Sequence, residues 1–370
     1  MFSIILPFMK NPSVRPLPRA NFRWKSDRWA GTMEGMNITR KRVMALLDAF
    51  KHQRILVVGD LMLDRFVYGH VTRISPEAPV PVVRVSRETS MPGGASNVAC
   101  NIRTLGAAAS IAGLLGKDPE GVELRWLLKE AGAETECALM FAGARTIVKE
   151  RIIAEQQQVV RVDFEKPAEW TPRQQEKFLA MLALELEKAD GVIIEDYGKG
   201  AIAQPVVDLI LSAAAKRGIP VGLDPKEGRE LDIRGITVAT PNRKEALAIA
   251  GLSEPGVREN PLTDKTLLRA GAILMEKWEA KHLAITLGPQ GVLLLTAGRP
   301  PQHVQTRARE VYDVSGAGDT VIAACVTALA AGATFGEAVP LANIAAGVVV
   351  GKLGTASCTP GELLASMRPR

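Results

Sequence analysis

The stretch Asp313-Val314-Ser315-Gly316-Ala317-Gly318-Asp319-Thr320 leads directly into a run of small, mostly apolar residues from Val321 to Ala331. This pattern predicts a helix that starts near the glycines and carries Asp319 in its first turn. A helix start directs free backbone N–H groups and the positive end of the helix dipole at one spot, and side chains this small let an anion reach it. A carboxylate there is better interpreted as a base that faces an anion than as its ligand. The segment therefore favours a phosphotransferase site, although glycine turns and acidic first turns also occur at helix starts for structural reasons alone.

Strands and helices alternate along most of the chain, which predicts right-handed βαβ units and an α/β fold. The central sheet should be mostly parallel, with helices on both faces, because apolar runs such as Ile55–Val58 fit strands that are buried on both sides. The expected strands are a run from Arg54 that ends in a turn at Gly59-Asp60, then 109–115, 136–141, 191–195, 220–224, 236–239, 283–287 and 292–296. The expected helices are a pattern that ends at Phe50, then 95–105, 119–131, 172–189, 203–217, 243–250, 264–279, 316–331 and, last in the fold, 336–350.

Two β pairs interrupt this alternation, at 67–74 with 80–87 and at 145–153 with 158–165. No helical pattern lies within them that could cover a second face. We therefore expect one small projecting sheet, a lid formed by about 67–90 and 145–165. Its uncovered face is a candidate contact for a homodimer.

The net charge of +6 raises the question of nucleic-acid binding, but its distribution argues against it. Residues 1–35 hold six Lys or Arg and two Asp or Glu, a net of +4, so the other residues are near +2. We expect residues 1–36 to be a disordered basic extension, dispensable over its first 32–35 residues, and 37–370 to be the functional domain. Neither nucleic acid nor a membrane is expected as a partner, because no apolar run approaches the roughly 18 residues that span a bilayer.

The four cysteines are scattered and include no C-x-x-C pair. Cys100 and Cys325 lie in apolar helical patterns, which is typical of buried free thiols. No secretory signal is evident at the N-terminus. These observations favour the reducing cytoplasm.

Polar and glycine-rich segments follow several of the predicted strands, where ligands bind in open α/β sheets. Asp60 and Asp64 lie in an expected turn after the first strand, and could accept hydrogen bonds from sugar hydroxyls or simply cap the turn. The turn Met91-Pro92-Gly93-Gly94 precedes Asn97, whose amide can both donate and accept. Further segments of this kind are Glu195–Gly200 with an exposed Lys199, Asp224-Pro225-Lys226, Thr240–Glu245 and Thr286–Gly291. Each alone is an ordinary loop, but together at one edge of a sheet they predict a binding site.

With these residues in place, the chain resembles the ribokinase-like (PfkB) family of carbohydrate kinases from about residue 54 to 360. The resemblance implies a three-layer sandwich with a projecting β lid, and ATP and Mg²⁺ as cofactors. The motifs that carry it are the family's C-terminal signature at 313–324, its Gly-Gly-x-x-Asn motif at Gly93, Gly94 and Asn97, and its Asn-x-x-Glu motif at Asn242 and Glu245.

The family's functional residues carry over to matching positions of this chain. Asp319 is implied as the base, with the backbone N–H groups of Gly316, Ala317 and Gly318 around the transferred phosphoryl group. The implied sugar ligands are Asp60, Asp64, Gly93, Gly94, Asn97 and Asp196. The implied nucleotide ligands are Lys226, Asn242, Thr286, Gly288, Gly291, Gly318 and Asn343. Asn242 and Glu245 are implied to position Mg²⁺ through water. Asp313, Ser315 and the loop 352–357 are implied, more weakly, as a K⁺ site.

Within the family, the chain most resembles kinases of D-glycero-D-manno-heptose 7-phosphate, in the segments 59–65, 73–82 and 195–200. This implies phosphorylation of the anomeric O1 to the 1,7-bisphosphate, a step toward ADP-heptose and the lipopolysaccharide core. Many such kinases carry a fused nucleotidyltransferase, but no His-x-Gly-His motif is found here, so we expect adenylyl transfer on another protein. Candidates for binding the 7-phosphate are Lys199 and the lid cations Arg73, Lys149, Arg151 and Arg161, of which Lys149 and Arg151 share a strand face. Alternatively these lid cations only solvate a sheet edge.

Two other functions stay open at this stage. The chain could be another ribokinase-like sugar kinase, acting on fructose 6-phosphate, ribose or adenosine. It could also be a catalytically inactive sugar-binding regulator, although intact Asp319, Asn242 and Glu245 speak against that hypothesis. A panel of substrates separates these alternatives.

Overall fold

The computed structural model describes residues 38–155, 157–166, 170–254, 256–306 and 311–367. The basic extension predicted for residues 1–36 lies outside this set. Within the described ranges, no helix combines the length and the apolar character that a membrane crossing needs.

The described residues form a main sheet whose strands run in the order β13-β12-β11-β10-β9-β8-β1-β4-β5. All neighbours pair in parallel except β11 with β12 and β12 with β13, which are antiparallel, so the prediction of a mostly parallel sheet is confirmed. The strand bounds are β1 (Arg54–Gly59), β4 (Ala108–Gly116), β5 (Glu134–Phe141), β8 (Gly191–Glu195), β9 (Val221–Asp224), β10 (Val238–Ala239), β11 (His282–Thr286), β12 (Val292–Thr296) and β13 (Gln302–Val304).

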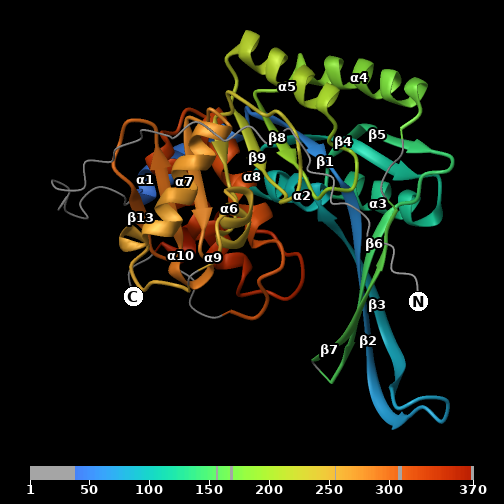
Figure 1. Cartoon of the computed structure of the whole chain (residues 1–370). Coiled ribbons are helices and arrows are strands. Elements are labelled where there is room, and N and C mark those ends of the chain that lie inside the picture. Colours follow the sequence, from blue (N-terminus) through green and yellow to red (C-terminus); the bar gives the residue numbers. More distant parts are fainter. Residues whose placement is uncertain (1–37, 156, 167–169, 255, 307–310, 368–370) are drawn as a thin grey trace, which may run out of the picture. The chain divides into compact units, whose positions relative to one another are not determined.

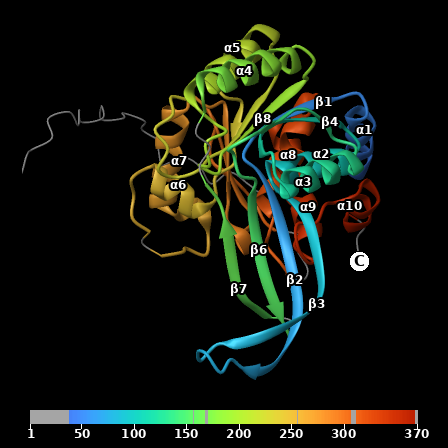
Figure 2. The same cartoon turned by 90° about the vertical axis from the view of Figure 1, so that its right-hand side faces the viewer.

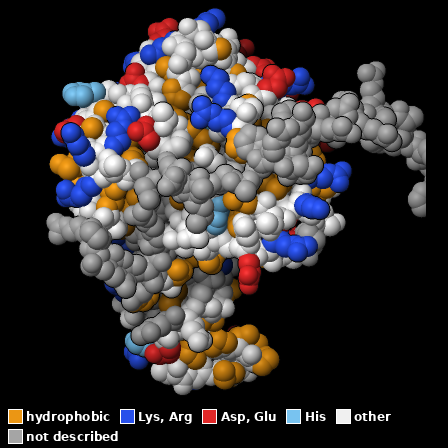
Figure 3. All heavy atoms as spheres, turned by 90° about the vertical axis from the view of Figure 1, so that its left-hand side faces the viewer, with side chains coloured by type: hydrophobic (Ala, Val, Ile, Leu, Met, Phe, Trp, Pro, Cys, Tyr) orange, Lys and Arg blue, Asp and Glu red, His pale blue; other side chains and the backbone are white. Residues whose placement is uncertain are grey.

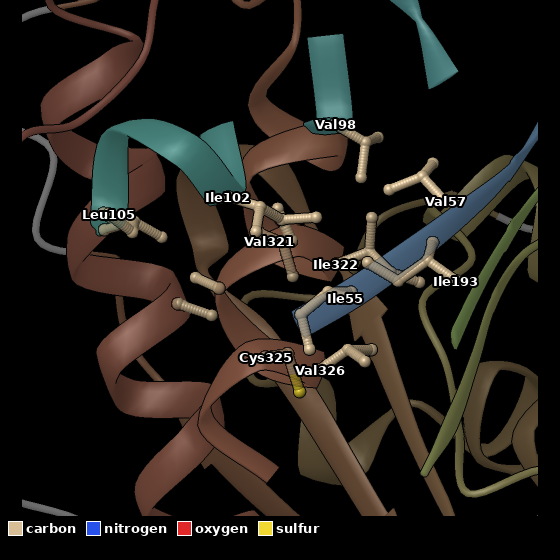
Figure 4. Packing of buried hydrophobic residues seen from close by; sticks show 14 of the residues in the cluster. Ile55, Val57, Val98, Ile102, Leu105, Ile193, Val321, Ile322, Cys325 and Val326 are labelled. Carbon is tan, nitrogen blue, oxygen red and sulfur yellow. The ribbon is translucent and has the colours of Figure 1, made fainter. Parts of the chain in front are cut away.

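Helices cover both faces of this sheet, and the side-chain alternation of β1 shows why. Ile55 and Val57 pack into one apolar core, while Leu56 and Val58 pack into the other. The first core contains α1 (Arg40–Phe50), α2 (Ala95–Leu105), α3 (Pro119–Glu130), α8 (Ala317–Ala330), α9 (Phe335–Val349) and α10 (Pro360–Ser366), and the second contains α4 (Pro172–Leu186), α5 (Gln204–Arg217), α6 (Arg243–Ile249) and α7 (Lys265–Lys277). Figure 4 shows the first core where β1 meets α2 and α8. The predicted three-layer α/β architecture is therefore confirmed.

The lid is a separate sheet with the strand order β3-β2-β6-β7, and it projects from the main sheet (Figures 1 and 2). Its strands are β2 (Leu61–Ile74), β3 (Pro81–Gly94), β6 (Ile147–Ala154) and β7 (Gln157–Phe164). β2 pairs with β3 in antiparallel and with β6 in parallel orientation. The projecting lid expected from the sequence is present.

Several predicted boundaries were wrong. Of the turn expected around residues 60–64, only Asp60 lies outside a strand, because Leu61 already pairs with Gly94 in the lid. For the same reason, the turn expected at 91–94 is the last part of β3, so the lid strands are longer than predicted. Strand β10 has two residues instead of four, and β13 and α10 were not predicted. The helix ending at Val349 is thus not the last in the fold.

Candidate active site

Asp319 lies in the first turn of α8, after Gly316 in the left-handed conformation with φ of 76°. Its side chain is buried and accepts two hydrogen bonds, from Asn97 Nδ2 at 2.6 Å and from the Tyr197 hydroxyl at 3.0 Å. Burial raises the pKa of Asp319 to about 6, and the bonds from Asn97 and Tyr197 oppose this rise. The carboxylate is thus held in place and is more basic than an exposed aspartate.

The backbone at the start of α8 leaves donors unused beside this carboxylate. Among the described residues, the N–H groups of Gly316 and Gly318 have no hydrogen-bond acceptor, whereas the Ala317 N–H donates to the Val314 carbonyl at a long 3.3 Å. A helix start with open N–H groups is suited to binding an anion such as a phosphoryl group.

A polar network fixes Asn97 against α8. Asn101, one turn later on α2, donates from Nδ2 to the Asn97 side-chain oxygen at 3.1 Å, and its own oxygen accepts from the Thr320 hydroxyl at 2.9 Å. A Cβ atom on Gly316 would lie 2.6 Å from Asn97 Nδ2, so only glycine leaves room for this contact. Asn101 was not among the predicted site residues, although its spacing of four residues from Asn97 places both on one helix face.

The two adjacent glycines before α2 are required by close packing against β2. A Cβ atom on Gly93 would lie 2.5 Å from Asp64 Oδ2, and one on Gly94 would lie 2.7 Å from Met62 Cε. Gly94 also has a positive φ of 54°. These glycines therefore bring the start of α2, with Asn97, next to Asp64.

Asp60 holds the loop that follows β8. Its Oδ2 accepts from the backbone N–H groups of Tyr197 at 2.9 Å and Lys199 at 3.0 Å, and its Oδ1 accepts from that of Ala201 at 3.0 Å. Both carboxylate oxygens are thus occupied by backbone donors, and this arrangement favours a positioning role over a contact with sugar. Tyr197, which reaches Asp319 from this loop, was within a quoted motif but was not among the predicted site residues.

Asp196 and Asp64 both have cationic partners. Asp196 accepts from Arg229 Nε at 3.1 Å and from the Gly198 N–H at 2.8 Å. Asp64, on β2, accepts from Arg151 Nη1 of β6 at 2.5 Å. Burial raises the pKa of Asp64, and Arg151 opposes this rise.

Three more of the candidate phosphate-binding cations have carboxylate partners, all within the lid or directly after its last strand. Lys149 binds Asp163 at 2.9 Å and also Glu165, and Arg161 binds Asp163 at 2.9 Å. Lys199 binds Glu165 at 2.6 Å. The structure therefore brings Lys149, Arg151 and Lys199 together near the base of the lid, with acidic neighbours between them.

Asn242 and Glu245 form a reciprocal cap at the start of α6. Asn242 Oδ1 accepts from the Glu245 N–H and Glu245 Oε2 accepts from the Asn242 N–H, both at 3.0 Å. Lys226 Nζ lies 4.0 Å from the other oxygen of Glu245. The motif is therefore a capping box as well as a candidate Mg²⁺ site, and one oxygen of Glu245 takes no part in the cap.

Two further carboxylates lie close to Asp319, the buried Glu195 and the half-buried Asp224. Glu195 and Asp224 end the neighbouring strands β8 and β9, and one oxygen of each lies within 4.8 Å of the others and of Asp319. In the described part of the chain, Glu195 Oε2 is buried without a hydrogen-bond partner. Burial, followed by repulsion from Asp224, raises the pKa of Glu195 well above its usual value. Such a set of oxygen donors fits a divalent cation.

The remaining predicted residues lie at two further places. Thr286 ends β11 next to Asn242. Gly288 and Gly291 form the turn into β12. A Cβ atom on Gly291 would lie only 2.0 Å from the Val304 carbonyl oxygen. Asn343 on α9 donates to the Gln305 carbonyl at 2.7 Å. Asp313 accepts from the Ser315 N–H at 2.9 Å and from the Gly354 N–H at 3.0 Å, which joins the 313–318 segment to the 352–357 loop.

A buried carboxylate base, open backbone donors at a helix start and clustered oxygen donors, all at the carboxyl edge of an α/β sheet, define a phosphotransferase of the sugar-kinase class. The model of the pfkB family of carbohydrate kinases matches residues 52–362. The chain belongs to this family and is a sugar kinase.

The chain is also similar to curated relatives in sequence and to solved structures in fold. The chain is 44% identical to the bifunctional protein HldE of Hahella chejuensis, over 86% of this chain and 64% of that protein, and 44% identical to HldE of Magnetococcus marinus, over 86% and 65%. It thus spans just under two thirds of these relatives. Its fold is similar to that of Escherichia coli phosphofructokinase-2 in complex with potassium (TM-score 0.67, 22% identity, 85% of this chain and 97% of that one). It is also similar to Arabidopsis thaliana ribokinase complexed with ribose and ATP (TM-score 0.64, 19% identity, 86% and 99%).

Proposed function

We propose that the protein transfers the γ-phosphate of ATP to the anomeric O1 of D-glycero-D-manno-heptose 7-phosphate. The observation that carries the chemistry is the Asp319 carboxylate, held by Asn97 and Tyr197 beside the open N–H groups of α8. The choice of sugar rests on the segments 59–65, 73–82 and 195–200, which resemble heptose 7-phosphate kinases, and on the relatives named HldE. The product would supply ADP-heptose and lipopolysaccharide synthesis.

In this mechanism, Asp319 accepts the proton of the sugar hydroxyl as its oxygen attacks the γ-phosphorus. The new O–P bond forms while the bond from the γ-phosphorus to the oxygen of ADP breaks, and ADP leaves with that electron pair. An anomeric hydroxyl is more acidic than an ordinary alcohol, so a carboxylate with a pKa of about 6 is a suitable base. Backbone N–H groups of Gly316 and Gly318 would stabilise negative charge on the phosphoryl group during transfer.

ATP and a divalent cation would lie on the opposite side of the phosphoryl group from the sugar. Thr286, Gly288, Gly291 and Asn343 are proposed along the nucleotide, with Lys226 near its phosphates. Asn242 and the free oxygen of Glu245 would hold Mg²⁺ through water, and the buried Glu195 and half-buried Asp224 add further oxygen donors. Bound Mg²⁺ neutralises charge on the phosphates. A K⁺ ion near Asp313 and Ser315 would use the lone pairs that the backbone N–H groups leave.

We further propose that the protein acts in the cytoplasm as a homodimer joined through its lids. Among the described residues, all four cysteines are free, as the reducing cytoplasm keeps them. Apolar side chains are exposed at the far end of the lid, which supports the dimer contact.

The test is ATP turnover with D-glycero-D-manno-heptose 7-phosphate beside fructose 6-phosphate, ribose and adenosine, for the wild type and Asp319→Asn. Asparagine keeps the shape of the side chain but removes the base. Turnover confined to the heptose phosphate and lost in the variant supports the proposal. Turnover of a different sugar reassigns the substrate, and ATP binding without any turnover favours a regulator.

A further inference from the structure

Two polar side chains, Asn101 and Thr320, are buried in the apolar contact between α2 and α8. Figure 4 shows this contact, with Ile102 of α2 beside Val321 of α8. Asn101 is 1% exposed and Thr320 is 0% exposed. Polar groups in such a place cost stability unless they are bonded, and a pair of apolar side chains of the same shape would pack there equally well. Packing alone therefore does not explain the pair.

The main chain fixes which end of the Asn101 amide faces Asn97. Asn101 Nδ2 donates to the backbone carbonyl oxygen of Asn97 at 3.0 Å. A carbonyl oxygen only accepts hydrogen bonds, so the end of the Asn101 amide that faces it has to be the nitrogen. The other end, the side-chain oxygen, accepts from the Thr320 hydroxyl at 2.9 Å. The orientation of Asn101 is thus set by the main chain and agrees with the contact to Thr320.

Asn101 in turn fixes the amide of Asn97. Its nitrogen also donates to Asn97 Oδ1 at 3.1 Å, and Asn97 Nδ2 donates to Asp319 Oδ2 at 2.6 Å. If the Asn97 amide turned over, its nitrogen would face the nitrogen of Asn101 and its oxygen would face the carboxylate. Donor would then meet donor and acceptor would meet acceptor, which is unfavourable in a buried site. Without Asn101, only the carboxylate of Asp319 opposes this rotation.

The rotation matters most once Asp319 has accepted a proton. The carboxyl group is then neutral and carries a proton of its own to donate, so it no longer repels the Asn97 oxygen. An Asn97 amide that was free to turn would accept this proton in a hydrogen bond and hold it on Asp319. Asn101 opposes that turn at every stage, because its own orientation is set by the main chain.

The same orientation decides what Asn97 offers to a bound sugar. One N–H of Asn97 Nδ2 is used by Asp319, and the other has no acceptor among the described residues. The side-chain oxygen faces Asn101. A sugar beside Asp319 therefore meets a hydrogen-bond donor of Asn97, whereas the sequence alone left both donation and acceptance open.

We propose that Asn101 is a positioning residue which, together with Thr320, sets the direction of the Asn97 amide. The nitrogen of Asn97 then faces Asp319 and the sugar throughout the reaction. This inference rests on the proposed function for the role of Asp319 as the base, but it does not depend on which sugar is the substrate.

The first measurement needs no turnover. NMR of the side-chain NH2 groups, in protein labelled at asparagine, compares the wild type with Asn101→Leu, which keeps the branched shape but has no donor. Asn97→Asp identifies the Asn97 signal by its loss. We expect the two NH2 protons of Asn97 to be well separated in the wild type, because one of them binds a carboxylate, and closer together in Asn101→Leu and, to a smaller extent, in Thr320→Val. An unchanged Asn97 signal in both variants would overturn the proposal, whether or not the heptose phosphate is a substrate.

Steady-state kinetics, with the sugar that the substrate panel identifies, test the consequence for catalysis. Misdirecting a hydrogen bond to a charged group should lower kcat by on the order of 10- to 100-fold in Asn101→Leu, with the KM for ATP unchanged. Thr320→Val should show a smaller fall, and Thr320→Ser, which keeps the hydroxyl, should retain turnover. Thr327→Val is the matched control, because Thr327 is also buried on α8 but donates to the Ala323 carbonyl of its own helix. It should keep the kcat of the wild type.

A double variant separates positioning from a general loss of packing. If Asn101 and Thr320 act as one unit, Thr320→Val should cause no further fall in kcat in the Asn101→Leu background. Calorimetry with a non-hydrolysable ATP analogue, at one analogue per chain, shows that each variant is folded. A folded Asn101→Leu enzyme with normal kcat, additive effects in the double variant, or an equal fall in Thr327→Val would overturn the proposal.

Discussion

Asp319 combines two opposing influences on one carboxyl group. Burial disfavours its ionised form, while the donors of Asn97 and Tyr197 favour it, and the outcome is a pKa of about 6. Burial also raises the pKa of the Tyr197 phenol, so its hydroxyl remains a donor throughout the physiological range. The base is thus ionised at neutral pH and is still basic enough to take a proton as the sugar hydroxyl attacks.

The pH dependence of turnover should report this carboxyl group. We expect kcat/KM to rise with pH through an acid limb near 6, because only the ionised form accepts the proton. Tyr197→Phe removes a donor that lowers the pKa, so the limb should move to higher pH, by on the order of one unit. An acid limb that stays in place in the Tyr197→Phe enzyme would show that Tyr197 does not act on the base. The unfolding temperature of each variant serves as the folding control.

Replacement of Gly316 should show whether its contact with Asn97 matters for catalysis beyond the effect of backbone strain on stability. Alanine at this position meets a positive φ of 76° and a contact of 2.6 Å with Asn97 Nδ2. Gly332, just after α8, has a φ of 80° but nothing within 4 Å of an added Cβ atom. Gly332→Ala should cost roughly 1–2 kcal/mol of stability for the positive φ alone. Gly316→Ala should cost at least as much, because the close contact with Asn97 is added to the same backbone strain.

Only Gly316→Ala should also lower kcat, because it moves Asn97 away from Asp319. The measurements are denaturant unfolding and steady-state turnover of the two variants side by side. Equal kcat in both would mean that the Asn97–Asp319 contact tolerates the added methyl group.

At the scale of elements, the site is assembled where β1 passes into β2 and the β8 loop meets α8. Asp60 is the single residue between two strands that belong to different sheets, and its carboxylate fastens the 197–201 loop. This arrangement couples the start of the lid to the loop that carries Tyr197 and Lys199.

Asp60→Asn should therefore impair the site through the loop. One carboxylate oxygen becomes an amide that donates, and it would then face a backbone N–H, leaving a buried donor unsatisfied at a cost of about 1–3 kcal/mol. We expect lower stability together with lower kcat. Asp190→Asn is the matched control, because Asp190 accepts from the Arg54 N–H at the opposite end of β1. The amide oxygen that this substitution keeps can still accept that N–H, so Asp190→Asn should leave both stability and kcat close to those of the wild type. A normal kcat in Asp60→Asn would contradict the positioning role.

The elements that the sequence predicted well are those with strong local signals. The alternation of helices with buried strands, and the glycine-led start of α8, follow from patterns within a few residues. Residues 61–64 and 91–94 were misinterpreted because Gly, Asp and Pro are typical of turns, whereas here long-range pairing in the lid makes them strand. Asp196 binds Arg229, and Asp60 binds backbone N–H groups of the loop after β8. Both sets of partners are distant in sequence, so no local pattern could have revealed them.

At the scale of the whole molecule, two apolar cores on opposite faces fix the main sheet, whereas one face of the lid sheet carries no helix from the described part of the chain. Ile74, Val80 and Val85 near the far end of the lid are 61%, 51% and 50% exposed. Figure 3 shows hydrophobic side chains gathered there. A group of exposed apolar side chains on a projecting sheet is the kind of surface that a second copy would cover.

This surface yields a prediction about assembly. In the double variant Ile74→Asp with Val85→Asp, closing the contact would bury two carboxylates without partners, which is strongly unfavourable. We expect light scattering after size exclusion to give the mass of a dimer for the wild type and of a monomer for this variant. Val122→Asp on α3 is the control, since Val122 is 60% exposed but lies outside the lid, and it should remain dimeric. A monomeric wild type, or a dimeric double variant, would place any association of this protein on another surface.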